Sequence, residues 1–159
     1  MAAAASAVGG AAAVVVLSPR PGELSAIQAE APPASPVRAS AAILKASDGH
    51  YWADGEVNGR TVRFLVDTGA TEVALTPGDA QRLGIDPDKL RYGGRVVTAG
   101  GQIRAASIRL ASITVAGARL DNVDALVIEK GLDTSLLGMT YLGRLSSFEA
   151  TRGALVLQP

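Results

Sequence analysis

Short apolar runs separated by glycine-containing turns fill the chain from Asp48 to Pro159. This pattern is typical of strands joined by tight turns and predicts an all-β fold. The clearest turn is Asn58-Gly59, because Asn-Gly readily adopts the backbone angles of a two-residue hairpin between strands expected at 51–57 and 61–66. The remaining strands are expected at 95–98, 102–105, 108–115, 120–128, 148–151 and 154–157.

Two short helices are expected within this β-rich part. Thr76 has the side chain of a helix N-cap, and Pro77 suits the first helical position. Gly84 suits the C-terminal end, so the sequence predicts one helix between Thr76 and Gly84. A second helix is predicted at 139–145, directly after Leu136-Leu137-Gly138.

The chain contains a weak internal repeat. Residues 57–62 resemble residues 115–120, and each copy leads into an apolar strand. The first copy continues to Asp67-Thr68-Gly69 and a helix, and the second continues to Leu136-Leu137-Gly138 and a helix. The pattern predicts a duplicated hairpin–strand–helix unit folded about a local pseudo-twofold axis. The alternative is a chance likeness between two hairpins.

The first 47 residues are rich in alanine, serine, proline and valine, and differ from the rest. Residues 2–17 form an uncharged apolar stretch without the basic segment of a secretory signal, and shorter than the roughly 20 residues of a membrane span. We expect either a targeting or anchoring segment or a disordered leader, followed by a Pro-rich linker at 32–36. The sequence therefore predicts a tail, 1–47, that tethers a folded domain, 48–159. A membrane-anchored or periplasmic location is expected, and a cytoplasmic location stays open.

Composition excludes several classes of function. The 15 basic and 15 acidic side chains balance and form no basic stripe, which argues against a nucleic-acid partner. The chain has no cysteine, which excludes disulfides and thiol catalysis. Its single histidine, His50, excludes a multi-His metal site and would have to carry any Ser-His-Asp triad by itself. Neither a metal nor a cofactor is expected.

The strongest chemical signal is Asp67-Thr68-Gly69-Ala70, which directly follows the apolar run 62–66. An Asp-Thr-Gly triplet by itself also suits an ordinary turn. Here a second apolar run follows at 73–75, so the carboxylate is expected between two buried strands, where removing it from water is costly. This context favours a functional role for Asp67.

Residues 48–159 resemble the retropepsin-like aspartic proteases, the single-lobe class that includes the retroviral proteases. They are more closely similar to a bacterial group with an N-terminal membrane segment. The resemblance depends on four segments, 48–52, 64–71, 98–101 and 135–139. It implies a single-lobe acid protease barrel with one or two short helices, behind a disordered or membrane-targeting tail.

The resemblance implies that Asp67 is the catalytic carboxylate. Chemistry of this class needs two carboxylates about 3 Å apart, which share one proton and activate a water molecule. The chain contains one Asp-Thr-Gly, because the related triplet Asp133-Thr134-Ser135 lacks the glycine and lies in an expected loop. The second Asp67 is therefore expected from another copy of the chain in a C2 homodimer.

The residues around Asp67 are expected to shape and support its loop. Thr68 would hydrogen-bond across the twofold axis, and Gly69 would let backbone and carboxylate approach closely. Ala70 would keep the substrate side of the loop small. Leu136-Leu137-Gly138 is expected to pack beneath the loop and hold it rigid.

The glycine-rich tip Ala99-Gly100-Gly101 is the expected flap over an extended polypeptide substrate. An ordinary glycine-tipped hairpin is the alternative. Trp52 is expected to pack in the core or at an interface, and Glu72 to be a solvated loop residue. Pocket residues are expected to include Arg95, Val97, Ile103 and Leu132.

Three functions are compatible with these sequence features. The leading hypothesis is a homodimeric aspartic endopeptidase, and the second is a non-catalytic β-rich dimerisation or peptide-binding module on the same fold. The third is a processing enzyme that removes its own tail before Asp48. The apolar end 154–157 needs a partner strand, and the interleaved termini of retropepsin dimers would supply one.

Overall fold

The structure is a computed structural model, and it describes residues 41–98 and 101–159. These residues form ten strands, two α-helices and one 3-10 helix. In chain order the elements are β1 (Ala41–Leu44), β2 (Trp52–Val57), β3 (Arg60–Val66), β4 (Val73–Leu75), α1 (Pro77–Arg82), the 3-10 helix η1 (Pro87–Lys89), β5 (Gly94–Thr98), β6 (Gly101–Val115), β7 (Ala118–Ile128), β8 (Ser135–Leu137), α2 (Met139–Leu142), β9 (Ser147–Ala150) and β10 (Ala154–Gln158).

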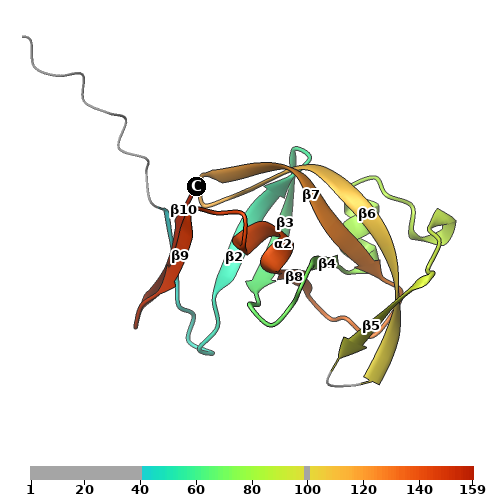
Figure 1. Cartoon of the computed structure of the whole chain (residues 1–159), viewed down its shortest axis with the longest axis horizontal. Helices are drawn as coiled ribbons and strands as arrows, with labels where there is room; N and C mark the ends of the chain where they lie inside the picture. Colours follow the sequence, from blue (N-terminus) through green and yellow to red (C-terminus); the bar gives the residue numbers. More distant parts are fainter. Residues whose placement is uncertain (1–40, 99–100) are drawn as a thin grey trace, which may run out of the picture. The chain divides into compact units, whose positions relative to one another are not determined.

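Seven strands form one sheet in the order β2-β3-β8-β4-β7-β6-β5, and β2 also pairs with β6. The additional pairing closes six strands into a barrel and leaves β5 outside it, as Figure 1 shows. Buried side chains fill the barrel. The closed six-stranded barrel with two short α-helices confirms the predicted all-β, single-lobe acid protease fold with one or two short helices. The largest fully buried side chains include Phe64, Leu75, Leu110, Ile113, Leu137, Tyr141 and Leu142.

The strand pairing supports the internal repeat. Strand β3 pairs in parallel with β8, and β4 pairs in parallel with β7, so each half of the repeat supplies a strand to the other half. The two hairpin turns also match, because Asn58 and Gly59 have φ values of 50° and 80°, and Ala116 and Gly117 have 48° and 81°. Positive φ at both turn residues is the signature of a two-residue type I′ hairpin.

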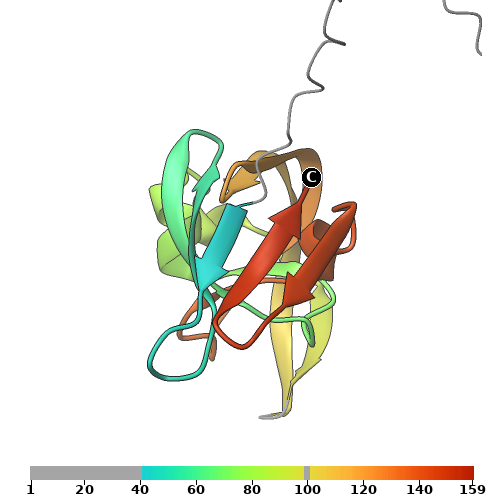
Figure 2. The same ribbon diagram turned by 90° about the vertical axis from the view of Figure 1, so that its left-hand side faces the viewer.

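A second sheet of three strands has the order β1-β10-β9 and is seen face-on in Figure 2. Its strand β1 corrects the predicted domain boundary at Asp48, because Ala41–Leu44 pairs with Ala154–Leu157 and Ile43 is buried in the core. It also corrects the expectation for the C-terminal strand, since β10 has β1 on one side and β9 on the other, both from the same chain.

Strand β6 is one continuous strand of 15 residues, although the sequence predicted two strands, at 102–105 and 108–115. The neighbours Ala105 and Ala106 are both buried, which interrupts the alternation of buried and exposed positions. That interruption resembles a strand end in the sequence. In the fold it marks the region where β6 pairs with β5 on one side and β7 on the other.

The helices begin where predicted, and the second ends earlier than predicted. The hydroxyl of Thr76 accepts a hydrogen bond from the Asp79 N–H at 3.1 Å, so Thr76 is the N-cap of α1. Gly84 follows the helix with a φ of +86°. Helix α2 ends at Leu142 and not at residue 145, because its hydrogen-bonding pattern closes with the Gly143 N–H on the Met139 carbonyl.

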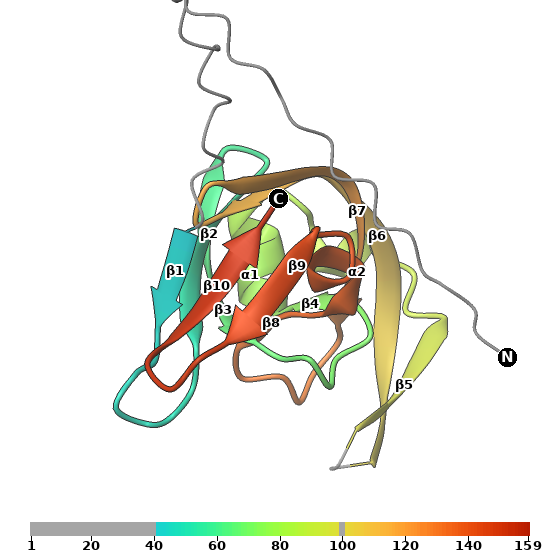
Figure 3. The ribbon, with the colours of Figure 1, turned by 60° about the vertical axis from the view of Figure 1, so that its left-hand side comes forward.

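The terminal sheet and the flap hairpin of β5 and β6 lie at opposite ends of the folded part (Figures 1 and 3). The predicted anchor at 2–17 and linker at 32–36 lie outside the described residues, so their assignment and the location of the protein stay predictions. Within residues 41–98 and 101–159, no helix is long and apolar enough to cross a bilayer.

Candidate active site

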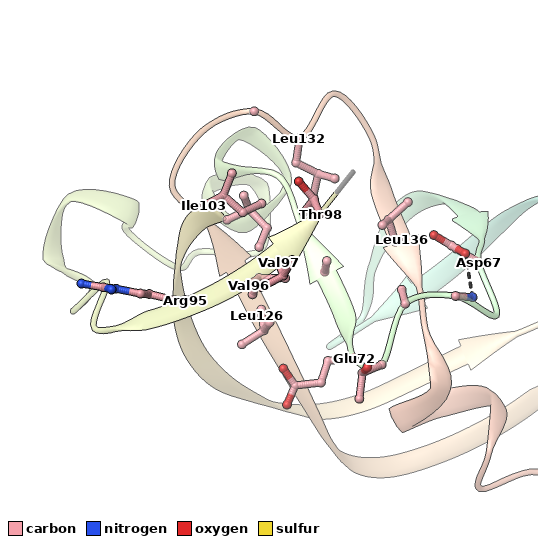
Figure 4. Close-up of a pocket in the computed structure, with 16 residues that line it drawn as sticks. Asp67, Glu72, Arg95, Val96, Val97, Thr98, Ile103, Leu126, Leu132 and Leu136 are labelled. Atoms are coloured by element: carbon pink, nitrogen blue, oxygen red, sulfur yellow. Dashed lines mark hydrogen bonds between the residues drawn. The ribbon is translucent and has the colours of Figure 1, made fainter. Parts of the chain in front are cut away.

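Asp67 lies directly after β3, in a tight turn held by its own backbone. Its N–H donates to the Leu137 carbonyl at 3.2 Å, which extends the β3–β8 pairing by one residue. The Asp67 carbonyl accepts from the Ala70 N–H at 3.2 Å, and its carboxylate Oδ1 accepts from the Gly69 N–H at 2.8 Å, drawn dashed in Figure 4. The half-buried carboxylate is therefore fixed in orientation by the turn it begins.

The residues predicted to flank Asp67 have distinct positions. Thr68 is exposed, so its side chain is accessible to a second molecule. A Cβ at Gly69 would lie 3.1 Å from Asp67 Oδ1, a closer approach than nine in ten real Cβ contacts. Ala70 is half-buried and lines the pocket described below.

Gly138 lies beneath the Asp67 loop in contact with its backbone. A Cβ at this position would lie 2.2 Å from the Glu72 carbonyl oxygen and 2.8 Å from the Ala70 carbonyl oxygen. Its φ of −95° is ordinary, so the requirement for glycine comes from this close approach and not from backbone conformation. Leu137 beside it is fully buried, whereas Leu136 faces the pocket.

Hydrogen bonds from the start of α2 hold the loop in this position. The Met139 N–H donates to the Ala70 carbonyl at 2.9 Å, and the Thr140 N–H donates to the Thr71 carbonyl at 3.0 Å. In return, the Thr140 hydroxyl accepts from the Val73 N–H at 2.9 Å. The loop after Asp67 is therefore tied to α2 at Ala70, Thr71 and Val73.

A buried polar cluster behind β8 was not predicted from the sequence. The Ser135 hydroxyl donates to Asp79 Oδ2 at 2.5 Å and accepts from the Thr76 N–H at 3.1 Å. Thr76 also donates to Asp79 Oδ2, and Arg82 pairs with Asp79 Oδ1 at 3.1 Å. Asp79 is 7% exposed, so its charge is compensated within the fold, and the cluster ties α1 to the strand under Asp67.

Asp67 opens onto a pocket of about 700 Å³ beneath the flap hairpin. Its wall is mainly apolar and is built on a small second core of Ala74, Ala105 and Ile128. All four residues that the sequence suggested for the pocket line it, together with several that it did not suggest. The lining residues are Asp67, Gly69, Ala70, Thr71, Glu72, Ala74, Arg95, Val96, Val97, Thr98, Ile103, Leu126, Ile128, Gly131, Leu132 and Leu136.

The acidic residues of this pocket are Asp67 and Glu72. Glu72 is exposed, as expected for a solvated loop residue, but it also lines the pocket, and Figure 4 shows its carboxylate directed away from Asp67. Asp133, the aspartate of the related triplet, lies exposed in a loop and does not line the pocket. The described residues of one chain therefore place one carboxylate, that of Asp67, at the predicted site.

The predicted flap is a β5–β6 hairpin in which Thr98 pairs with Gly101. Its tip residues 99 and 100 lie outside the described residues. Gly101 has a φ of +110°, and its carbonyl accepts from the Thr98 hydroxyl at 2.9 Å. Val97, 78% exposed, lines the pocket from the flap side, so this hairpin presents an apolar side chain to whatever the pocket binds.

Trp52 and His50 organise the loop that leads into β2. The Asp48 carboxylate accepts from the His50 N–H at 2.9 Å and from Trp52 Nε1 at 2.8 Å, and these hydrogen bonds lower the pKa of Asp48 below its usual value. The Arg63 guanidinium lies over the Trp52 ring, 5.2 Å from its centroid. Trp52 is half-buried, and the packing role suggested for it fits these contacts.

Comparisons with known proteins place this arrangement in one family. Residues 53–144 match the family described as gag-polyprotein putative aspartyl protease. A crystal structure of a retropepsin-like aspartic protease from Rickettsia conorii is 40% identical, with a TM-score of 0.68 over 74% of this chain and 98% of that one. The EIAV protease complexed with the inhibitor HBY-793 is 22% identical, with a TM-score of 0.52 over 64% of this chain and 93% of that one, and supports the fold.

Two curated relatives are uncharacterized proteins. One, from Rickettsia prowazekii (strain Madrid E), is 41% identical over 115 residues, which cover 72% of this chain and 49% of that protein. The other, encoded in the cobV 5′ region of a Sinorhizobium species, is 38% identical over 117 residues, which cover 73% and 50%. The chain thus spans about half the length of these relatives.

The family match covers more than half of the 159 residues, and the chain covers nearly all of a solved relative at 40% identity. A closed β-barrel with an Asp-Thr-Gly turn beneath a flap hairpin defines the class of single-lobe acid proteases. The chain belongs to the retropepsin-like aspartic protease family.

Proposed function

We propose that this chain is one half of an aspartic endopeptidase whose active centre consists of two Asp67 carboxylates, one from each subunit of a homodimer. The observation that carries the proposal is the isolated Asp67, which is oriented by the Gly69 N–H at the mouth of an apolar pocket. Glu72, the other acid of that pocket, is directed away from it. A second copy related by a C2 axis through the Asp67 loop supplies the missing carboxylate without any further residue.

The reaction follows from two carboxylates that share one proton. Like charges about 3 Å apart cannot both ionise, so one Asp67 is protonated and the other is ionised. The ionised carboxylate takes a proton from a water molecule, whose oxygen attacks the substrate carbonyl carbon while the protonated carboxylate donates its proton to the carbonyl oxygen. Transfer of a proton to the amide nitrogen then breaks the C–N bond.

An extended polypeptide with apolar side chains fits the pocket. Its wall offers Val96, Ile103, Leu126, Leu132 and Leu136 to a side chain, and the flap strand lies along one side. A strand-like substrate can pair its backbone with such a flap while alternate side chains enter the pocket. The charged Arg95 is directed away from these apolar residues in Figure 4, so it does not oppose apolar binding.

The test compares cleavage of an unfolded protein substrate by the wild-type chain, Asp67→Asn and the matched control Asp133→Asn. We expect the wild type and Asp133→Asn to cleave equally, since Asp133 is an exposed loop residue outside the pocket, and Asp67→Asn to lose at least about a thousandfold in kcat. Equal cleavage by Asp67→Asn would overturn the proposal. Absence of cleavage by a confirmed wild-type dimer at every pH from about 3 to 7 would instead favour the non-catalytic binding module.

A further inference from the structure

Arg104 joins three chain segments at the base of the flap hairpin. Its Nε and Nη2 donate to the Tyr92 carbonyl at 3.2 and 3.0 Å, and its Nη1 donates to Glu129 Oε1 at 3.1 Å. The Glu129 N–H donates to the Arg104 carbonyl at 3.0 Å, so backbone and side chain of Arg104 both take part. We call this arrangement of Tyr92, Arg104 and Glu129 the flap clamp.

The first segment of the flap clamp leads straight into the flap. Tyr92 packs against the main core and is followed by Gly93 and Gly94, after which β5 carries the pocket residues Arg95 and Val96. A Cβ at Gly93 would meet nothing within 4 Å, so this residue is unconstrained by packing. Tyr92, whose carbonyl accepts from Arg104, is thus the last residue that packs against the main core before β5 begins.

The other two segments of the flap clamp also reach the pocket. Ile103, directly before Arg104, lines it, and so do Gly131 and Leu132, which follow Glu129 closely. A Cβ on Gly131 would lie 3.9 Å from Ile103 Cγ2, so the loop passes close to the flap strand there. All three clamped segments therefore carry pocket walls.

We propose that Arg104 is a positioning residue that fixes the base of the flap and, through it, the width of the pocket. Motion of the hairpin is confined to the part beyond the clamp, and the distance between the flap wall and the loop wall is set by one guanidinium. Arg104 thereby determines which substrate side chains the pocket accepts, without touching the reacting atoms. The effect on substrate choice rests on the proposed function, whereas the effect on the flap does not.

The contacts predict which replacements matter. The side chains of the Arg104–Glu129 ion pair are 62% and 31% exposed, so water screens their attraction and it contributes little on its own. The two hydrogen bonds to the Tyr92 carbonyl need a planar donor group, which lysine does not have. We expect flap amide exchange and KM to rise least in Glu129→Gln, more in Arg104→Lys and most in Arg104→Gln.

The chain offers a matched control on the same pair of strands. Arg109 on β6 pairs with Asp124 directly across on β7 at 2.8 Å, and both members are exposed. The Arg104–Glu129 pair is similar, with Glu129 one residue beyond the end of β7. Neither Arg109 nor Asp124 lines the pocket. Arg109→Gln therefore removes an equivalent cross-strand ion pair without loosening the flap.

The first measurement is backbone hydrogen exchange in the full chain, which requires no enzymatic activity. We expect Arg104→Gln to speed exchange about five- to thirtyfold for the amides of β5 and of 101–103, since both hydrogen bonds to the Tyr92 carbonyl are lost. In Arg104→Gln, amide exchange in β1 and β10 should stay at the wild-type rate. In Arg109→Gln, exchange should stay at the wild-type rate throughout the chain. Equal exchange in the two variants, or loosening of the terminal sheet as well, would overturn the clamp.

The second measurement is peptide cleavage with a series of apolar side chains of increasing size. Arg104→Gln is expected to raise KM about five- to thirtyfold, to change kcat by less than about twofold, and to lose discrimination between the side chains. A fall in kcat at constant KM would contradict a positioning role. If the wild type cleaves nothing, the proposed function fails, while the exchange measurement still decides whether Arg104 holds the flap.

Discussion

Replacing Gly138 by alanine should displace the Asp67 loop, because the added methyl group has no room. The new Cβ would lie 2.2 Å from the Glu72 carbonyl oxygen, 2.6 Å from the Glu72 carbonyl carbon and 2.8 Å from the Ala70 carbonyl oxygen. All three are backbone atoms, which cannot rotate away as a side chain would. The loop after Asp67 must therefore move by about 1.2 Å, the difference between 2.2 Å and 3.4 Å, to reach an ordinary contact distance.

The magnitude follows from the contacts that this movement disturbs. Overpacking of this kind costs about 1–3 kcal/mol. The two backbone hydrogen bonds from Met139 and Thr140 to the displaced loop add about 1 kcal/mol each if they break. We expect Gly138→Ala to lower the free energy of unfolding by about 3–5 kcal/mol, and a 1 Å displacement of Asp67 to lower cleavage about a hundredfold.

Urea denaturation of the full chain measures the stability change, and Gly78→Ala provides the control. Gly78 lies in α1, and a Cβ there would meet Thr76 Oγ1 at an ordinary 4.0 Å. Alanine is the better helix former, so this variant should be unchanged or more stable by up to about 1 kcal/mol. A Gly138→Ala protein with the wild-type midpoint and full cleavage would refute the idea that Gly138 supports the Asp67 loop.

Three other features of the fold each lead to a prediction. Ser135→Ala should lower the free energy of unfolding by about 2–3 kcal/mol in urea, because it removes one hydrogen bond to buried Asp79 and the acceptor of the Thr76 N–H. The exposed Ser146→Ala should change it by less than about 0.5 kcal/mol. Burial raises the pKa of Tyr141 from 10.0 to about 12, so the tyrosine ionises first in the unfolded chain, and the free energy of unfolding should fall by roughly 2–3 kcal/mol between pH 10 and 12. Alkaline melts of Tyr141→Phe should lack this fall, and an identical fall in the variant would contradict the assignment to Tyr141. A fragment beginning at residue 48 lacks β1 and buried Ile43, so its free energy of unfolding should be lower by at least about 2 kcal/mol than that of a fragment beginning at residue 36. Equal thermal midpoints of the two fragments would show that β1 is dispensable.

The barrel could be predicted from the sequence because its signals are local. Asn58-Gly59 specifies a hairpin by its own backbone preference, and the capping residue Thr76 specifies a helix start in the same way. The Asp67 turn is equally local, since the hydrogen bond that orients the carboxylate comes from a residue two positions away.

The parts that were missed depend on contacts between distant segments. Among the side chains of β1 whose burial is described, 42–44, only Ile43 is buried, so this segment looks like the end of an alanine-rich tail until β10 pairs with it. Asp79 and Ser135 are 56 residues apart and meet only when α1 packs against β8. The pocket position of Glu72 likewise depends on how its loop lies under the flap, which no local pattern specifies.

The central claim is that one chain carries half of an active centre, and subunit mixing tests it most directly. Wild-type chain at fixed concentration is mixed with increasing amounts of Asp67→Asn chain, with Asp133→Asn as the control partner, and cleavage is measured after equilibration. If the site needs an Asp67 from each subunit, an excess of Asp67→Asn converts wild-type dimers into inactive mixed dimers, and cleavage falls toward zero. The control partner is expected to raise total cleavage. Cleavage that follows the amount of wild-type chain whatever the excess of Asp67→Asn would contradict the claim.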